Sequence, residues 1–482
     1  MSRPRSHLRE RVLAAFLSSG VLGGCADDAD SDPLRPSYPS LAVVSGCESE
    51  KYQVCDVLDS DCQASIFATM KCLRRMPDGV LPELRVITQE ERRAELSEAL
   101  APEPEDVVQR DAEERAFSML GLAQPGDFAP ASVVDLFTET VPAYYSFETG
   151  TVTLIEPEGE PREPGQLTLT LAHEFAHALQ DQDVDLAGLL QNTTTFDAHL
   201  ARISLVEGEA EMLESFFAAT LWGFSDNPDF RQRYTSWLDD AESSYGNTSP
   251  LLVSQRYVPY SYGARFVYNV YAEGGMDAVR ARFSDLPGSV LPILLSADQL
   301  EEPPIESLAE RSAPPGLDGF ELLVSDTLGP WILSKFLERG MFDPGPQALV
   351  ASWRADRFFV YAAPDGPVAA LWTLRFEDAA AAEQLLGALG QGRNVKNAIG
   401  RAFATVSERE LTLGVVEDSL TFDDWSAAAE EAQRVWREAP PAARAPRTPS
   451  RPVAPRLSAT RFSAPWLGRE LSAQSVPGWA SP

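Results

Sequence analysis

One sixteen-residue stretch, LTLTLAHEFAHALQDQ at 167–182, constrains this chain most, because it places two histidines and a glutamate on an otherwise apolar run. The apolar residues around the histidines predict a buried helix. Positions four apart share one face of a helix, so His173 and His177 can direct their imidazoles at a single ion. A buried imidazole pair without a partner is costly. The stretch therefore predicts a metal site rather than an ordinary core helix.

Glu174 stands between the two histidines and completes the pattern H-E-x-x-H. In proteins with this pattern the histidines hold zinc, and the glutamate is the general base toward a water on the ion, whose pKa the ion lowers. The whole chain has four histidines, so a chance match at this spacing is rare. The sequence therefore predicts one zinc ion held by His173 and His177, with Glu174 as the base.

A third protein ligand is expected, because catalytic zinc takes three and leaves its fourth position to water. The stretch FDAHLARISLVEGEAEMLESFFAATLW at 196–222 predicts a long amphipathic helix. Glu207 falls on its apolar face, where a charged side chain needs a partner such as a metal. His199, near the helix start where an exposed histidine costs nothing, is the competing ligand. Glu209 is interpreted as part of a solvated helix face.

Six segments of the chain occur in the order typical of one protein family. They are LPELRVITQEE, ERAFSMLGL, YYSFETGTVTLI, LAHEFAHALQDQDVDL, LVEGEA and VPYSYGARFVYNVYAEGGMDAV. Through them the chain resembles, over roughly residues 82–425, a family of uncharacterised bacterial gluzincin-like proteins. The resemblance implies a zincin-like metallopeptidase fold and a zinc peptidase without a known substrate. The chain departs from the family pattern at Ser146, Phe147 and Met276, none of which is a predicted ligand.

In gluzincins the helix that carries the glutamate ligand reads E-x-x-x-D, and the second acid orients a ligand histidine. Glu207 and Glu211 keep this spacing, with a glutamate in place of the aspartate, so the resemblance implies that Glu211 has this role. Hydrolysis also needs a hydrogen-bond donor for the oxyanion. Tyr260, in VPYSYG, is the first candidate and Tyr262 the second. The alternative is that these aromatic rings simply pack at the start of a helix.

The remaining patterns predict an α+β fold. ELRVIT reads as a strand, and the helices QEERRAELSEAL and EDVVQRDAEERAFSMLGL follow it. AYYSFETGTVTLIE reads as a hairpin with its turn at 148–150. Its second strand, TVTLIE, is expected beside the histidine helix, as an edge strand that pairs with an extended peptide. We expect these elements to form a mainly helical catalytic domain at 81–300. The pattern strand, strand, helix, strand, strand then predicts a small α+β module at 301–437.

The N-terminus predicts export. Arginines precede an apolar run from Val12 to Leu22, which is too short to span a bilayer as a helix but suits a signal peptide. The run ends in LGGC, which is similar to a bacterial lipobox. We therefore expect a lipoprotein signal peptide over 1–24, a lipid anchor on Cys25 and a polar tether over 25–46. An ordinary signal peptide that leaves Cys25 as a thiol is the alternative.

The other four cysteines lie within 26 residues, in a segment that we assign to 47–80. In an exported chain such a cluster reads as two disulfides, with three possible pairings. The spacings do not fit the close ligand pairs of a zinc site. The cluster consists of Cys47, Cys55, Cys62 and Cys72.

Charge and composition narrow the partners. The net charge of −32 argues against a nucleic-acid partner, because binding to phosphates needs clustered Lys and Arg. The tail at 438–482 is rich in Pro, Arg and Ser and too poor in apolar residues to pack, so we expect it to be disordered.

Together these patterns predict an exported, lipid-anchored zinc peptidase of the bacterial cell envelope, on the periplasmic face or at the cell surface. Its expected partners are a peptide or protein substrate and, through Cys25, a membrane. Two alternatives stay open. One is a surface lipoprotein that keeps the zinc fold without catalysis, and the other is a zinc hydrolase of cell-wall amide bonds.

Overall fold

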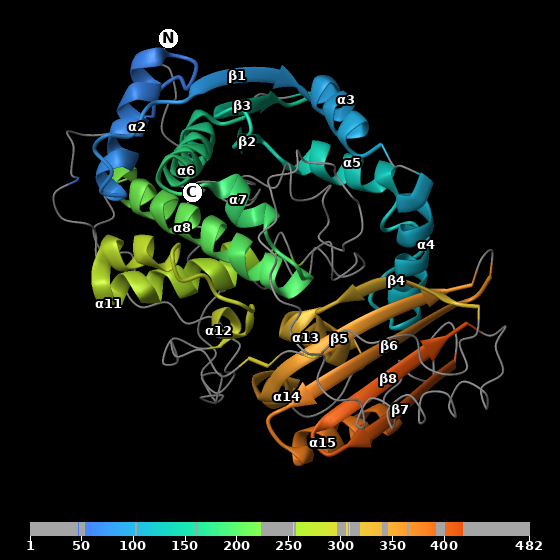
Figure 1. Cartoon of the computed structure of the whole chain (residues 1–482). Coiled ribbons are helices and arrows are strands. Elements are labelled where there is room, and N and C mark those ends of the chain that lie inside the picture. The colour runs from blue at the N-terminus through green and yellow to red at the C-terminus, as the bar shows by residue number, and fades with distance from the viewer. Residues whose placement is uncertain are drawn as a thin grey trace, which may run out of the picture.

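Two β-sheets and the helices around them form the structure (Figure 1), which is a computed structural model. It describes residues 47, 54–101, 104–159, 162–222, 254, 257–295, 305–306, 308, 319–339, 346–363, 366–391 and 401–417. The predicted signal peptide, Cys25, the tether and the tail at 438–482 lie outside the described residues. No helix in the described part of the chain is long and apolar enough to cross a membrane. The fold is α+β, as predicted.

The smaller sheet has three strands in the order β1-β3-β2. Strand β1 (Glu83–Thr88) runs parallel to β3 (Thr151–Glu156), and β2 (Ala143–Ser146) runs antiparallel to it. The predicted strand and hairpin are confirmed, and Gly150 takes the positive φ of 68° that its turn requires. The prediction that TVTLIE is an edge strand is wrong. Because β1 pairs with its other side, β3 is central, and β2 is the edge strand that packs against the histidine helix.

Three helices connect β1 to β2. Helix α3 (Gln89–Ala99) begins with a capping box between Thr88 and Glu91, and α4 (Pro104–Met119) ends just before Gly121, whose φ is 73°. These two helices were predicted. The third, α5 (Pro130–Thr140), was not.

The helix that carries the histidines is α6 (Pro164–Asp183). Proline stands at its first position, where the missing N–H costs no hydrogen bond, as the sequence predicts. The side chains from Thr168 to Gln180 are all buried. A short helix, α7 (Leu186–Gln191), leads to α8 (Phe196–Trp222), which packs along α6 (Figure 1).

The cysteine-rich segment packs against both α6 and α8. Its helix α2 (Ser60–Leu73) places the ring of Phe67 edge-on to that of Phe175, with the ring centroids 5.2 Å apart. Of the three possible disulfide pairings, the structure contains Cys47–Cys72 and Cys55–Cys62. The stapled segment is therefore part of the core around the histidine helix.

A π-helix, η2 (Pro259–Gly263), and the helix α11 (Ala264–Arg282) cover α8, and the short helix α12 (Leu291–Leu294) packs against η2. The backbones of α8 and η2 touch. A Cβ atom on Gly208 would lie 2.4 Å from the carbonyl carbon of Gly263, so neither position has room for a side chain. These two glycines fix η2 against the helix that carries Glu207.

The larger sheet has five antiparallel strands in the order β4-β5-β6-β8-β7. The predicted order of four strands and a helix is confirmed, while β4, α13 and α14 were not predicted. Helix α4 packs against the larger sheet (Figure 1), where the ring of Phe117 stacks on that of Phe358. The elements are β4 (Glu321–Asp326), α13 (Gly329–Arg339), α14 (Pro346–Ser352), β5 (Trp353–Ala362), β6 (Val368–Phe376), α15 (Ala379–Gln391), β7 (Arg401–Ser407) and β8 (Glu410–Val416).

Candidate metal centre

The contact between α6 and α8 brings the predicted ligands together. The candidate ligand atoms of His173, His177 and Glu207 all lie within 4.8 Å of one another. Nε2 of each histidine is 3.3 Å from the same atom, Oε2 of Glu207. Zinc bonds of about 2.0–2.1 Å in a tetrahedral site place ligand atoms about 3.3–3.4 Å apart. This buried group therefore has the atoms and the spacing to hold one metal ion.

The three side chains are removed from solvent, with exposed fractions of 0 % for the histidines and 1 % for Glu207. Burial alone would raise the pKa of Glu207, but the two neighbouring imidazoles outweigh this effect and lower its pKa to about 2. The Glu207 and Glu214 carboxylates likewise outweigh burial and raise the pKa of His173 well above its ordinary value. The group is thus built around the buried Glu207 carboxylate, whose oxygen favours a cation beside it.

Glu174 is fully buried beside this group. Neither of its carboxylate oxygens has a hydrogen-bond partner among the described residues. Burial raises the pKa of Glu174 well above its ordinary value. The backbone of Tyr145, on the edge strand β2, approaches the carboxylate and acts weakly in the opposite direction, without meeting hydrogen-bond geometry. A carboxyl group in this environment is suited to accept and release a proton.

The second ring nitrogen of each histidine has a partner of its own. Nδ1 of His173 is 3.0 Å from Oε2 of Glu214, and Nδ1 of His177 is 2.8 Å from Oε1 of Gln180. Such contacts hold each ring with Nε2 directed at the metal position. Sequence reasoning missed both partners.

The resemblance implied that Glu211 orients a ligand histidine, but the described hydrogen bond of His173 Nδ1 goes to Glu214. Glu211 is nevertheless close. It forms a second group with His173 and Glu214 whose candidate ligand atoms lie within 4.8 Å of one another. The available signal for Glu214 was its position seven residues after Glu207, on the same face of α8.

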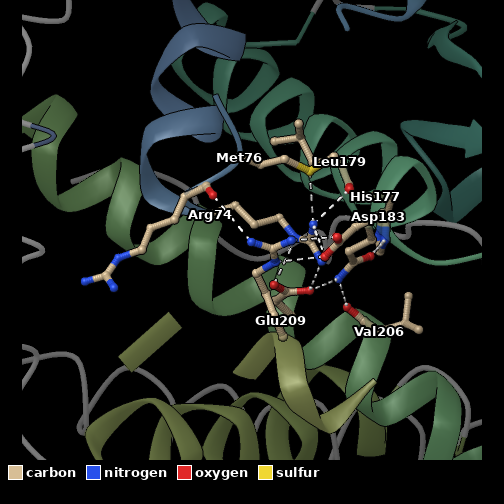
Figure 2. A network of polar contacts seen from close by, with 10 residues as sticks. Arg74, Met76, His177, Leu179, Asp183, Val206 and Glu209 are labelled. Atoms are coloured by element: carbon tan, nitrogen blue, oxygen red, sulfur yellow. Dashed lines mark hydrogen bonds and ion pairs between the residues drawn. The ribbon is translucent and has the colours of Figure 1, made fainter. Parts of the chain in front are cut away.

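The interpretation of Glu209 as a solvated side chain is wrong, because it is fully buried. Its Oε1 accepts a hydrogen bond from Nε of Arg74 at 3.0 Å, and its Oε2 accepts one from Nε2 of Gln180 at 2.9 Å. Figure 2 shows Glu209 and Arg74 in this network, with His177 close by. Helix α2 covers the side of α8 that the amphipathic pattern gave to solvent.

The two candidate tyrosines lie in different surroundings. The ring of Tyr260 stacks on the His173 imidazole, with the ring centroids 5.9 Å apart. Tyr262 packs instead against Trp331, with the guanidinium of Arg265 over its ring. The structure therefore brings Tyr260, the first candidate, to the metal centre.

His199, the competing third ligand, belongs to neither metal-capable group in the described part of the chain. The expectation that it is exposed is wrong, because only 4 % of its surface is accessible. Its Nδ1 is 3.3 Å from the hydroxyl of Thr193, and burial lowers the pKa of His199 to about 4. It is a neutral core histidine at the start of α8.

Comparisons of the chain with models of known protein families, with curated proteins and with solved structures returned no match. The gluzincin-like resemblance therefore stays a prediction from the motifs.

Proposed function

We propose that this protein is a zinc-dependent peptidase with a zincin-like catalytic domain. The observation that carries the proposal is the buried Glu174 carboxylate, which has no hydrogen-bond partner among the described residues. It lies next to His173, His177 and Glu207, whose ligand atoms are close enough to hold one metal ion. Two imidazoles and one carboxylate are a donor set typical of catalytic zinc. When bound, zinc supplies Lewis acidity that polarises a carbonyl group and acidifies water.

The residues of the chain provide the proton transfers. Glu174 takes a proton from the water that attacks the carbonyl carbon, and it delivers that proton to the nitrogen that leaves as the C–N bond breaks. The raised pKa of Glu174 suits the first step, because burial makes its carboxylate a stronger base toward the water. Tyr260, stacked on His173, is our candidate donor to the oxyanion.

A peptide is the proposed substrate because an edge strand lies beside the centre. Strand β2 is held to α6 by a hydrogen bond of 2.9 Å from the hydroxyl of Tyr145 to Asp181. An extended peptide that pairs with the edge of β2 would run beside the helix that carries Glu174.

The proposed location is the oxidising cell envelope, which suits the two disulfides. Lipid anchoring through Cys25 stays part of the proposal. Cys25→Ser should release the protein from the membrane fraction, and continued membrane association would contradict the anchor.

The decisive experiment compares Glu174→Gln with the matched control Glu163→Gln, at an exposed position at the start of the same helix. Digestion of a peptide library is measured with and without a chelator, together with the zinc content. We expect Glu174→Gln to keep one zinc per chain and to lose at least 100-fold in rate, the lower range typical of general-base catalysis. Unchanged turnover in this variant would refute the mechanism. Cleavage of a cell-wall substrate instead of peptides would favour the cell-wall amidase alternative.

A further inference from the structure

We propose that Arg74, the residue that caps the C-terminus of α2 in the disulfide-stapled segment, positions the zinc ligand His177 through Glu209 and Gln180. The inference rests on the metal centre of the proposed function. It assigns a role to Arg74, which lies outside the H-E-x-x-H pattern, 99 residues before the first histidine of that pattern. The chain of contacts begins at the metal ligand and ends at the stapled segment.

The first link is the side-chain amide of Gln180, whose orientation is determined by its partners. Its Nε2 lies 2.8 Å from the carbonyl oxygen of Val206 and 2.9 Å from Oε2 of Glu209. Both partners accept hydrogen bonds, so the nitrogen must be the donor. The amide oxygen is then the atom at 2.8 Å from Nδ1 of His177, and this oxygen can only accept.

It follows that Nδ1 of His177 carries the proton in this contact. In a neutral imidazole the other nitrogen, Nε2, then keeps its lone pair. That atom is the one directed at Oε2 of Glu207, 3.3 Å away. The amide of Gln180 thus selects both the ring orientation and the tautomer that can bind a metal.

The second link is the carboxylate of Glu209, which holds Gln180 in this orientation and is itself held by Arg74. Nε of Arg74 donates to Oε1 of Glu209 at 3.0 Å, and its Nη1 donates to the carbonyl oxygen of Leu179 at 2.9 Å and lies 3.1 Å from Oδ2 of Asp183. Figure 2 shows the guanidinium among these groups. Arg74 and Glu209 are both completely buried, so each needs the other.

Arg74 therefore joins three helices at one point. It extends from the end of α2, two residues after the disulfide-bonded Cys72, and contacts both α6 and α8. Its exposed neighbour Arg75 instead forms an ion pair with Asp277, at 3.4 Å. The stapled segment thus completes the support of one metal ligand, and Arg74 is a positioning residue rather than a catalytic one.

The test measures zinc affinity of the purified protein by competition with a chromophoric chelator, and the stability of the metal-free protein by thermal unfolding. Gln180→Met should weaken zinc binding 10- to 100-fold, the range typical when the partner of a ligand histidine is lost. Gln182→Met is the matched control, because Gln182 is exposed on the same helix and its amide contacts only Val80 in the described hydrogen bonds. Arg74→Met should weaken zinc binding about tenfold, and Arg75→Met should leave the affinity within twofold.

The double variant Arg74→Met with Gln180→Met separates positioning from general support. If Arg74 acts through Gln180, the double variant should bind zinc within threefold of Gln180→Met alone. Fully multiplicative losses would overturn the proposal, even if both single variants bind zinc weakly. Glu209→Gln provides a second approach if Arg74→Met does not fold. Because Arg74 can only donate, the amide oxygen at 209 faces Arg74 and the amide nitrogen faces Gln180. This arrangement lets the Gln180 amide reverse and face His177 with its nitrogen. Zinc affinity within twofold of wild type in a folded Glu209→Gln variant would also overturn it.

None of these measurements uses peptide hydrolysis, so the two proposals can fail separately. Wild-type protein that binds no zinc would refute the metal centre and the inference with it. Wild-type protein that binds zinc, with the Arg74, Glu209 and Gln180 variants unaffected, would refute the inference alone.

Discussion

Replacing Gly208 by alanine tests the contact that places Tyr260 next to the metal centre. The added Cβ would lie 2.4 Å from the carbonyl carbon of Gly263, 2.5 Å from its oxygen and 2.8 Å from the backbone nitrogen of Ala264. All three atoms belong to the backbone, so no flexible side chain can move aside. Restoring an ordinary contact of 3.4 Å requires a separation of 3.4 − 2.4 = 1.0 Å between α8 and η2.

The expected cost follows from two opposing effects. Overpacking of a well-packed site destabilises by about 3 kcal/mol at the upper end of its usual range, which applies here because rigid backbone is met on every side. Alanine in place of glycine inside a helix returns about 1 kcal/mol. The free energy of unfolding should therefore fall by about 2 kcal/mol, and the Tm by about 4–8 °C. Peptide hydrolysis should fall as well, because Tyr260 moves away from His173.

Gly387→Ala is the matched control for this prediction. Gly387 lies inside α15, is exposed, and has nothing within 4 Å of the position where a Cβ would stand. The same substitution there should raise the free energy of unfolding by up to about 1 kcal/mol. Thermal unfolding of both variants provides the measurement. A Gly208→Ala protein as stable as wild type would mean that α8 and η2 do not touch through their backbones.

Three further predictions concern the ligands, the staples and the buried acids. Glu207→Ala should remove most of the zinc from the purified protein while His199→Ala leaves the zinc content unchanged, and metal analysis with the reverse pattern would make this a three-histidine site. Replacing both cysteines of Cys47–Cys72 by alanine should lower the free energy of unfolding in urea by about 3–4 kcal/mol, against about 2 kcal/mol for Cys55–Cys62, because the closed loops differ in length, with separations of 25 and 7. The opposite order would contradict the loop-entropy argument. Burial raises the pKa of Asp197 to about 7. Between about pH 4 and 7 the unfolded chain therefore releases a proton from this group that the folded chain keeps. Over this range Asp197 lowers the free energy of unfolding by on the order of 4 kcal/mol as the pH rises. Asp197→Asn should flatten the slope of unfolding free energy against pH, and an unchanged slope would show that Asp197 is not buried as an acid.

Features that depend on local sequence were predictable. The periodicity around His173 and His177 predicted α6, and the turn at Gly150 predicted the hairpin. The order of strands in the smaller sheet was not predictable in the same way. The hairpin pairs one side of β3 with β2, but the partner of its other side comes from Glu83–Thr88, more than 60 residues earlier in the chain. The alternation of apolar and polar residues along a strand does not indicate which distant segment pairs with its free side.

Glu209 shows a signal that was present but not used. It lies two residues from Glu207, so an amphipathic reading of α8 turns it away from the core. Leu205, Met212 and Phe216 are nevertheless buried around the same helix. A helix that is apolar on every side is buried on every side, and a charged residue within it needs a charged partner. That partner, Arg74, belongs to a segment that the sequence assigned only to stapling.

The acid that holds His173 was placed four residues after Glu207 by family resemblance, whereas the described contact comes seven residues after it. Helix geometry explains why either spacing can serve. A residue seven positions on is about 20° from the direction of the first and about 10 Å along the axis, while one four positions on is about 40° away and about 6 Å along. The imidazole of His173 bridges the longer interval, with Nε2 toward Glu207 and Nδ1 toward Glu214. His177 lies one turn of α6 away and is held by an amide of its own helix. One ligand is therefore oriented by a carboxylate of α8, and the other depends on Gln180 and on the stapled segment behind it. The spacing of acids along α8 can therefore indicate the support of His173 by Glu214, but not the support of His177 by Gln180.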